Sequence, residues 1–336
     1  MNFKKLIAIA LVIVMCGALF VGCGGSDQET GGGDAEAADK PQYKIGVVIK
    51  TLGNPHFKGM ALGAEKAGKD YGVEIIPMAT QQEGQIAEQI QLIEDVISRG
   101  VDAVLVSPQT ALGMASAVKT ARDAGVVFVT MDTAIEDEYV PISIGLDDVE
   151  AGYNVGTVVA EKIGKKGKVF LIQGLAGDAS SIGRTEGVEK ALAEYPNIEI
   201  VARQNADFMQ DKAQEVVSDI LQAQKEVDAV ICLNDLMALG AITALEEMGY
   251  DVGPDGIIVT GFDGVLPALD SIKEGKMYLT EFLWEEYYGY WGVQACLKLL
   301  NGETVPERIK TPSSEITAEN VDSVYEIAKE ISDYGW

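Results

Sequence analysis

From residue 43 onward, short apolar runs alternate with longer stretches in which apolar residues recur every three or four positions. The run over residues 45–49 is followed by such a stretch over 55–70, and the alternation continues to about residue 300. Short apolar runs are typical of strands buried on both faces of a parallel sheet, whereas the longer spacing is typical of helices. The pattern therefore predicts an α/β fold with helices on both faces of parallel sheets.

The alternation starts again near residue 147, where Asp147 and Asp148 precede a helix predicted over 149–163. Each half spans roughly a hundred residues, the usual size of a domain. After a long helix predicted over 285–300, a proline-containing segment leads to a last helix that we expect to begin at Ile316. Thr317 or Asn320 is its candidate cap. The predicted strands cover residues 45–49, 73–78, 102–106, 126–131, 140–144, 168–172, 198–203, 230–233, 256–260 and 278–282.

The N-terminus has the three parts of an export signal: Lys4 and Lys5, an apolar run over 6–20, and small residues before Cys23. We predict a signal peptide over 1–22. The sequence Phe-Val-Gly-Cys-Gly over 20–24 resembles the lipobox of bacterial lipoproteins, in which the cysteine is lipidated and becomes the mature N-terminus. The Gly-rich, acidic residues 23–42 would then form a flexible tether. An ordinary secretory signal with an incidental cysteine is the alternative.

The composition narrows the class of partner. Lys and Arg total 26 against 52 Asp and Glu, a net charge of −26 that repels phosphate backbones, so we expect no nucleic-acid partner. Cys232 and Cys296 fall in buried patterns and should be free thiols. His56 is the only histidine and no paired-cysteine spacing occurs, so we predict no metal and no cofactor.

Polar and aromatic residues follow the predicted strands in both halves. Asn54, Asp132, Asn234 and Asp263 each come directly after or near the end of such a strand. Carboxylates and amides can bind vicinal hydroxyls, and aromatic faces pack on the C–H faces of a sugar. The pattern favours a small polyhydroxylated ligand between two lobes. Taken singly, the Asp and Asn residues could equally cap helices, and phenylalanines such as Phe57 could belong to the core.

Three motifs carry a more specific resemblance. Lys-Thr-Leu-Gly-Asn-Pro-His-Phe over 50–57, Asn-Asp-Leu-Met-Ala-Leu-Gly-Ala over 234–241 and Gly-Phe-Asp-Gly over 261–264 resemble motifs of the ribose-type periplasmic sugar-binding proteins. These are the substrate-binding components of bacterial ABC importers, and the resemblance covers residues 43–305. It implies the type I periplasmic binding protein fold, with two doubly wound lobes joined by a three-segment hinge. The implied lobes are 43–146 with 284–308, and 147–283 with 309–336.

The resemblance also implies which residues contact the sugar, and it shows departures from the ribose pattern. The implied contacts are Asn54, Phe57, Asp132, Phe208, Asn234, Phe262 and Asp263. Lys50 replaces a small hydroxyl residue, His56 an aromatic one, Thr133 an arginine and Leu283 a glutamine. Ile182 stands in place of a second arginine, with Arg184 two residues further on. We add Lys50, His56, Thr133 and Arg184 to the predicted ligand-binding set.

Losing two guanidinium groups and an amide removes strong, directional hydrogen bonds, so we do not expect a ribose receptor. Another pentose or hexose, a polyol or a deoxy sugar fits better, and Lys50 with His56 leaves room for an acidic sugar. We predict a monomeric receptor, lipid-anchored to the outer face of the cytoplasmic membrane, that passes its ligand to an ABC permease. Presentation of the ligand to a membrane sensor or chemoreceptor is the alternative. An exported enzyme using Asp132 and Asp263 on either side of a scissile bond is a third.

Overall fold

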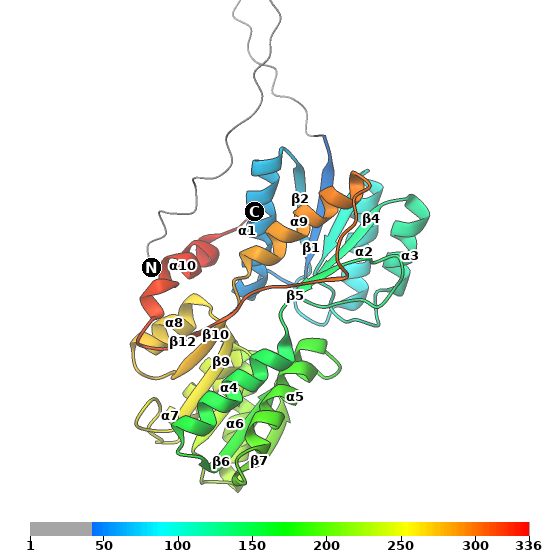
Figure 1. The fold of residues 1–336 in the computed structure, drawn as a ribbon. Helices are drawn as coiled ribbons and strands as arrows, with labels where there is room; N and C mark the ends of the chain where they lie inside the picture. The colour runs from blue at the N-terminus through cyan, green and yellow to red at the C-terminus, as the bar shows by residue number, and fades with distance from the viewer. Residues whose placement is uncertain (1–41, 336) are drawn as a thin grey trace, which may run out of the picture. The chain divides into compact units, whose positions relative to one another are not determined.

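The computed structural model describes residues 42–335. The predicted signal peptide, Cys23 and all but the last residue of the predicted tether lie outside them. The described part of the chain forms two six-stranded sheets with helices packed on them (Figure 1). None of the helices within it is both long and apolar enough to cross a bilayer. The α/β class predicted from the hydrophobic pattern is confirmed.

The first sheet is parallel throughout and has the strand order β11-β5-β4-β3-β1-β2. Helices α1 and α9 pack together against one face, and α2 and α3 pack together on the sheet as well. The strands are β1 (Lys44–Ile49), β2 (Glu74–Ala79), β3 (Ala103–Val106), β4 (Val127–Met131), β5 (Ser143–Gly145) and β11 (Arg308–Lys310). The helices are α1 (Pro55–Tyr71), α2 (Ile86–Ser98), α3 (Ala115–Ala124) and α9 (Glu286–Leu300).

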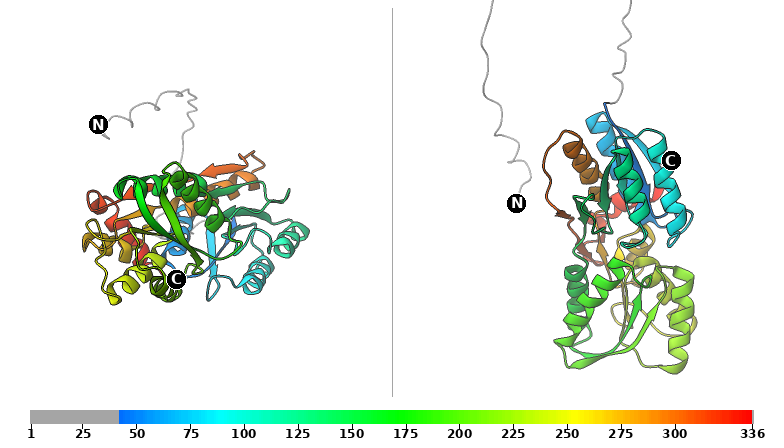
Figure 2. Two further views of the ribbon diagram at one scale, coloured as in Figure 1. Left: turned by 90° about the horizontal axis from the view of Figure 1, so that it is seen from below. Right: turned by 90° about the vertical axis from the view of Figure 1, so that its right-hand side faces the viewer.

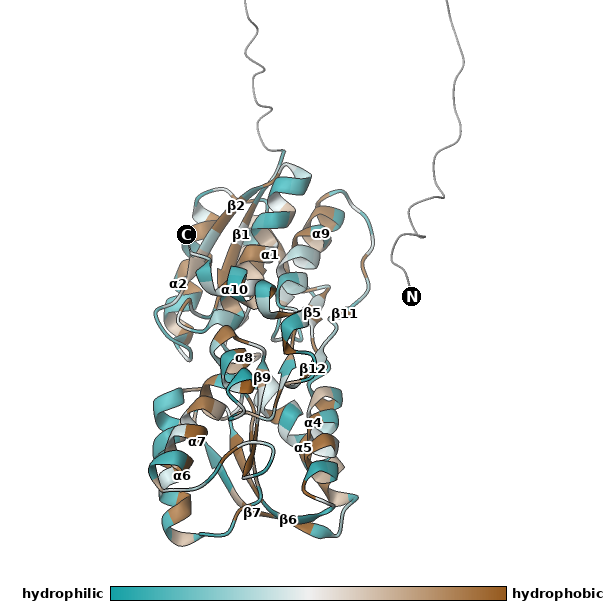
Figure 3. Ribbon diagram, turned by 90° about the vertical axis from the view of Figure 1, so that its left-hand side faces the viewer, coloured by the Kyte–Doolittle hydropathy of each residue, from teal (hydrophilic) through white to brown (hydrophobic). Residues whose placement is uncertain are grey.

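The second sheet has the order β12-β10-β9-β8-β6-β7 and is parallel except for the antiparallel edge strand β12. Figure 3 shows the pairs α4–α5 and α6–α7 on opposite sides of it. The strands are β6 (Lys166–Gln173), β7 (Asn197–Asn205), β8 (Ala229–Cys232), β9 (Ile258–Asp263), β10 (Leu279–Phe282) and β12 (Ser314–Ile316). The helices are α4 (Asp148–Lys162), α5 (Ala179–Ala193), α6 (Gln210–Ala223), α7 (Asp235–Glu247), α8 (Leu266–Lys273), η2 (Val321–Ser323) and α10 (Tyr325–Asp333).

The chain crosses between the two sheets three times, after β5, after β10 and after β11 (Figures 1 and 2). Each sheet is therefore assembled from more than one segment of sequence, as the resemblance implied. β11, which pairs with β5 in the first sheet, extends to Lys310, two residues beyond the predicted end of the first lobe. The lobe boundaries themselves stay a prediction.

Local sequence signals explain where the elements begin and end. The side chain of Asn54 accepts a hydrogen bond from the His56 backbone N–H, Pro55 occupies the first turn of α1, and Gly72 ends the helix with φ 66°. Each is a favoured residue for its place, because an amide caps free N–H groups, proline lacks one, and glycine tolerates a positive φ. Strands β3 and β8 are wholly buried apolar runs, and Cys232 and Cys296 are buried free thiols, as predicted.

The last helix begins later than predicted. Residues 314–316 form β12, because Ile316 pairs with Thr280 of β10 and buries its side chain. The two candidate caps bond to each other instead, since the Thr317 backbone N–H donates to Asn320 Oδ1 at 2.8 Å. Helix α10 starts only at Tyr325, with no side-chain cap. Tertiary strand pairing overrode the local helix signal here.

Candidate functional site

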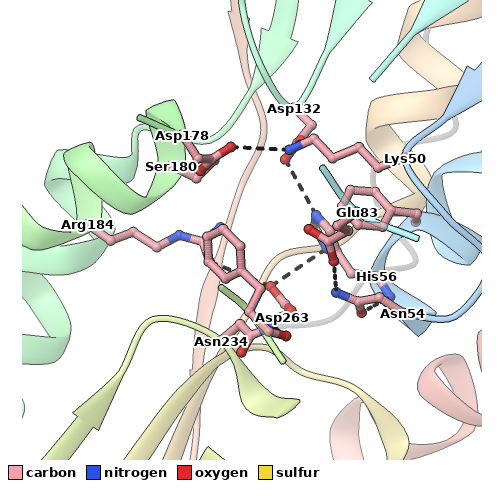
Figure 4. A pocket seen from close by; sticks show the side chains of 12 residues that line it. Lys50, Asn54, His56, Glu83, Asp132, Asp178, Ser180, Arg184, Asn234 and Asp263 are labelled. Carbon is pink, nitrogen blue, oxygen red and sulfur yellow. Dashed lines mark hydrogen bonds and ion pairs between the residues drawn. The ribbon is translucent and has the colours of Figure 1, made fainter. Parts of the chain in front are cut away.

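The carboxyl ends of strands from both sheets surround one chamber, which we call the inner chamber (Figure 4). This is the edge at which open parallel sheets bind ligands. Its lining residues are Lys50, Asn54, His56, Phe57, Glu83, Asp132, Asp178, Ser180, Arg184, Phe208, Asn234 and Asp263. All predicted ligand contacts except Thr133 and Phe262 lie in this lining.

The inner chamber is narrow. Its cavity volume is only about 20 Å³. Ligand pockets commonly measure roughly 300 to 1,000 Å³. The inner chamber is far below that range, because its own side chains nearly fill it, so a sugar ring would enter only as the lining residues move apart.

Lys50 is a buried cation held between the two sheets. Its Nζ lies 2.9 Å from Asp132 Oδ2, after β4, and 3.4 Å from Asp178 Oδ2, at the start of α5. Burial opposes its charge, but the carboxylates of Asp132 and Asp178 outweigh burial and raise the pKa of Lys50. The Lys50 side chain is only 4% exposed, so its pairs with Asp132 and Asp178 are buried ion pairs.

His56 lies among three carboxylates. Its Nε2 is 3.5 Å from Asp132 Oδ1, and its Nδ1 is 3.4 Å from Glu285 Oε1 and 3.8 Å from Asp263 Oδ1. Burial disfavours the imidazolium, but Asp263, Asp132 and Glu285 together raise the pKa of His56 to about 10. The ring is therefore a cation at neutral pH, and it contacts residues from both sheets and from the segment that follows β10.

Arg184 supplies a guanidinium to the chamber from α5. Its Nε donates to Asp148 Oδ1 at 3.0 Å, and one Nη donates to the Leu233 carbonyl at 2.7 Å. Asp263 Oδ1 lies 3.7 Å away. Ile182, which stands where a second arginine was expected, is 57% exposed. One of the two guanidinium groups missing from the sequence pattern is thus supplied from half a turn further along the helix.

The two asparagines of the site each cap a helix as well as line the chamber. Asn54 Nδ2 also donates to Glu83 Oε1 at 3.3 Å. Asn234 Oδ1 accepts from the Met237 backbone N–H at 2.9 Å, and its Nδ2 donates to the Phe208 carbonyl at 3.2 Å. The capping role considered from the sequence is therefore correct for Asn234. The same role is wrong for Asp263, because α8 begins after Val265 without a side-chain cap.

Several chamber residues have strained backbones. Asp132, Phe208 and Asp263 have φ values of 66°, 62° and 107°, in the region that favours glycine. Such strain persists only where neighbours hold it, and it concentrates at ligand sites. Behind Asp263, the buried Asp235 carboxylate accepts from the backbone N–H groups of Gly264 at 2.7 Å and of Val265 at 2.9 Å. This fixes the turn that presents Asp263.

Two predicted residues do not line the chamber. Successive residues of a strand point to opposite faces, so Phe262 is buried while Asp263 faces the chamber. The Arg184 guanidinium lies over the Phe262 ring, 4.8 Å from the ring centroid. Thr133 is fully buried, and its hydroxyl donates to Asp132 Oδ2 at 3.3 Å. Both support a neighbouring lining residue from behind.

Glu83, Asp178 and Ser180 line the chamber but were not predicted. Glu83 follows β2 and Asp178 follows β6, so the rule applied to the other strand ends would have found both. Burial raises the pKa of Glu83 to about 7, although Lys50 and Asn54 act in the opposite direction. Asp178 caps α5 through the Ser181 backbone N–H, and nothing in the local sequence indicates its second role as the partner of Lys50.

Comparison with known proteins identifies the family. The periplasmic binding protein domain family model matches residues 45–304. The chain belongs to this family. The chain is 32% identical over 278 residues to the ribose import binding protein of Bacillus subtilis (strain 168), covering 83% of this chain and 88% of that protein.

Other relatives are named for different ligands or hold different ligands in their structures. A xylitol-binding protein of Mycolicibacterium smegmatis is 27% identical over 297 residues, covering 88% of this chain and 83% of that protein. A solute-binding protein of Actinobacillus succinogenes with bound D-allose has a TM-score of 0.79 at 29% identity, covering 84% of this chain and all of the other. One from Bacillus halodurans with bound myo-inositol has a TM-score of 0.78 at 29% identity, covering 86% and 99%. Two lobes of the type I fold, as predicted, are thus confirmed.

Proposed function

We propose that this protein is an extracytoplasmic receptor that binds the ring of a neutral sugar or a polyol in the inner chamber and delivers the solute to an ABC importer. The observation that carries the proposal is the convergence of carboxylates, amides and aromatic rings from both sheets on one small space. Relatives with this fold are named for ribose and xylitol, or hold D-allose or myo-inositol. Carboxylate and amide groups match the paired hydroxyls of such ligands, and Phe57 and Phe208 supply apolar faces.

The charges of the chamber favour a neutral ligand over an acidic one. Of its described cationic lining residues, Lys50 faces two carboxylates, His56 three and Arg184 two. An incoming anion would have to compete with these carboxylates inside a desolvated site, where repulsion between like charges is strong. The acidic sugar left open by the sequence is therefore the less favoured ligand.

Ligand capture would proceed by closure of the two lobes. We propose that residues 43–146 with 284–308 move as one lobe and residues 147–283 with 309–336 as the other, about the three crossing segments. A ligand favours the closed form only if it contacts both lobes there. Asn54 and Asp132 from one lobe, with Asn234 and Asp263 from the other, satisfy that requirement.

The remaining parts of the proposal concern setting and chemistry. We also propose, as the sequence predicts, that Cys23 is lipidated, that the protein lies on the outer face of the cytoplasmic membrane, and that it is a monomer.

We propose that the protein binds its ligand without chemical turnover. Asp132, one of the two carboxyls considered for a glycosidase, is buried, but Lys50 and His56 hold its pKa well below the usual range, so it is a poor proton donor.

A thermal-shift screen tests the function. Pentoses, hexoses, polyols and sugar acids are each added to the mature protein, because a compound that binds only the native state raises the melting temperature. We expect a neutral sugar or polyol to give the largest shift, confirmed by calorimetry. A screen in which only sugar acids bind would refute the neutral ligand, and one in which no member binds would refute the sugar receptor.

A further inference from the structure

A second chamber lies at the mouth of the inner one. Its lining joins the loops that follow β1 and β2 in the first sheet to those that follow β6 and β7 in the second. The cavity volume of this outer chamber is about 320 Å³, compared with about 20 Å³ for the inner one. The outer chamber therefore has room for a second ring that the inner chamber lacks.

The two chambers open into each other. Asn54, Glu83 and Phe208 line both, so a ligand held in the inner chamber can extend past these three side chains into the outer one. Phe208 and the preceding Asp207 both have positive φ values, 62° and 52°. This strained pair holds the Phe208 ring against Gly174, at the boundary between the chambers.

The chemistry of the two chambers differs. The inner lining contains Lys50, His56 and Arg184, whereas the described residues that line the outer chamber include no cationic side chain. The outer lining has four apolar side chains, Leu175, Phe208, Met209 and Leu236, all from segments that follow strands of the second sheet. It also contains the amides of Gln81, Gln82 and Gln210 and the carboxylates of Glu83, Asp207 and Asp211. Met209 is 41% exposed and would lose water-exposed apolar surface on contact with a ligand.

We propose that the solute is a sugar that carries an apolar ring substituent, with the sugar in the inner chamber and the substituent in the outer one. The proposal rests on the proposed function and specifies its ligand class. An aromatic ring in the outer chamber would pack against Leu175, Met209 and Leu236, while its edge would meet the amides of Gln81 and Gln82.

The test compares matched derivatives of one sugar. The free sugar that raises the melting temperature most is taken forward as its phenyl glycosides and mono-O-benzyl ethers, which together carry the ring at every position, each paired with its methyl counterpart. Calorimetry should find at least one aromatic derivative that binds tenfold or more tightly than its methyl partner. In Leu175→Trp, where a larger side chain fills the outer chamber, the two members of that pair should bind equally.

Ile182→Trp is the control, because Ile182 is exposed and lies outside both linings, and it should leave the tenfold preference unchanged. If free sugars bind but every aromatic derivative binds no better than its methyl partner, the outer chamber is only the mouth of the cleft and the inference is wrong. A preference that persists in Leu175→Trp also overturns it. If no sugar binds in any form, the proposed function fails instead.

Discussion

Asp263 combines a buried carboxylate with a strained backbone, and two cations lie near it. Burial raises its pKa to about 6, although His56 and Arg184 act in the opposite direction. Its backbone is held by the hydrogen bonds that Asp235 makes to the next two residues, not by its own side chain. Its charge is therefore available for a ligand hydroxyl without being needed for the local fold.

Replacing Asp263 by Asn should weaken binding of the sugar found in the screen by about 1.5 to 3 kcal/mol, because a hydrogen bond to a charged group is lost. The wild-type affinity should fall as the pH drops through about 6, since the Asp263 carboxylate becomes protonated. The affinity of Asp263→Asn should change less with pH, because Glu83, whose pKa is about 7, still titrates in the chamber but Asp263 no longer does. Calorimetry between about pH 5 and about pH 8 measures the affinities of the wild type and the variant, because that range extends about one unit or more on each side of the Asp263 pKa. Equal affinities at neutral pH would remove Asp263 from the site.

Lys50 has the opposite character, since its charge is needed by the protein itself. Lys50→Met should lower the free energy of unfolding at neutral pH by about 3 kcal/mol, because Asp132 and Asp178 lose their shared cation in a buried place. Urea titration measures the change. Lys119→Met is the matched control, because its pair with Asp123 is exposed, and it should cost less than about 0.5 kcal/mol. Similar losses in the two variants would contradict the buried pairing.

At the scale of elements, close helix contacts position the charged groups of the second lobe. Helices α4 and α5 touch through glycine: a Cβ on Gly187 would lie 2.1 Å from the Val149 carbonyl oxygen and 2.6 Å from the Tyr153 backbone nitrogen. Real side chains cannot approach that closely, so the two helices need glycine here. Arg184 lies in α5 and Asp178 caps its start, so this contact between the helices fixes the positions of two chamber residues.

Gly187→Ala should therefore lower the free energy of unfolding by about 1 to 3 kcal/mol, because the added methyl group pushes backbone against backbone. Its effect should extend to sugar binding, since Arg184 would shift with the helix. Gly53→Ala is the comparison, because the atom nearest to its added Cβ is the Thr51 hydroxyl oxygen at 3.4 Å. Chemical denaturation of the two variants separates the cases, and equal stabilities would show that α4 and α5 have room to part.

At the scale of the whole described molecule, the Lys50–Asp178 pair connects the two lobes across the chamber. Asp178→Asn removes the charge but keeps a side chain that can still cap α5. Lys50 keeps Asp132 as a partner. The variant should therefore fold, yet the ligand-free protein should spend more time open. Its apparent affinity for the sugar should fall by about tenfold or less, in proportion to the closed population.

Small-angle scattering without sugar measures this opening as a larger radius of gyration than that of the wild type, and addition of saturating sugar should reduce the difference. Lys119→Met again serves as a charge-removal control remote from the chamber. An unchanged radius in Asp178→Asn would mean that the ion pair does not hold the lobes together.

Much of the fold and part of the site follow from neighbours along the chain. The alternation of apolar runs with helical spacing depends on residues a few positions apart, so the sequence alone predicts the α/β class. The same is true of Asn54 and Asn234 at their helix starts. Parallel strands bring their carboxyl ends to one edge, so residues such as Asp132 and Asp263 could be expected to lie close together.

The tertiary structure alone decided the rest. Asp178 and Lys50 are 128 positions apart, and no local pattern indicates that they form an ion pair. The inward direction of Arg184 depends on how α5 packs on α4, and residues 314–316 became a strand because β10 offered a free edge. Periodicity and capping act within a turn or two of chain, whereas charge pairing and burial depend on distances in space. For that reason the sequence determined the scaffold and the place of the site, and only the packing of the two lobes determined its charge balance and its shape.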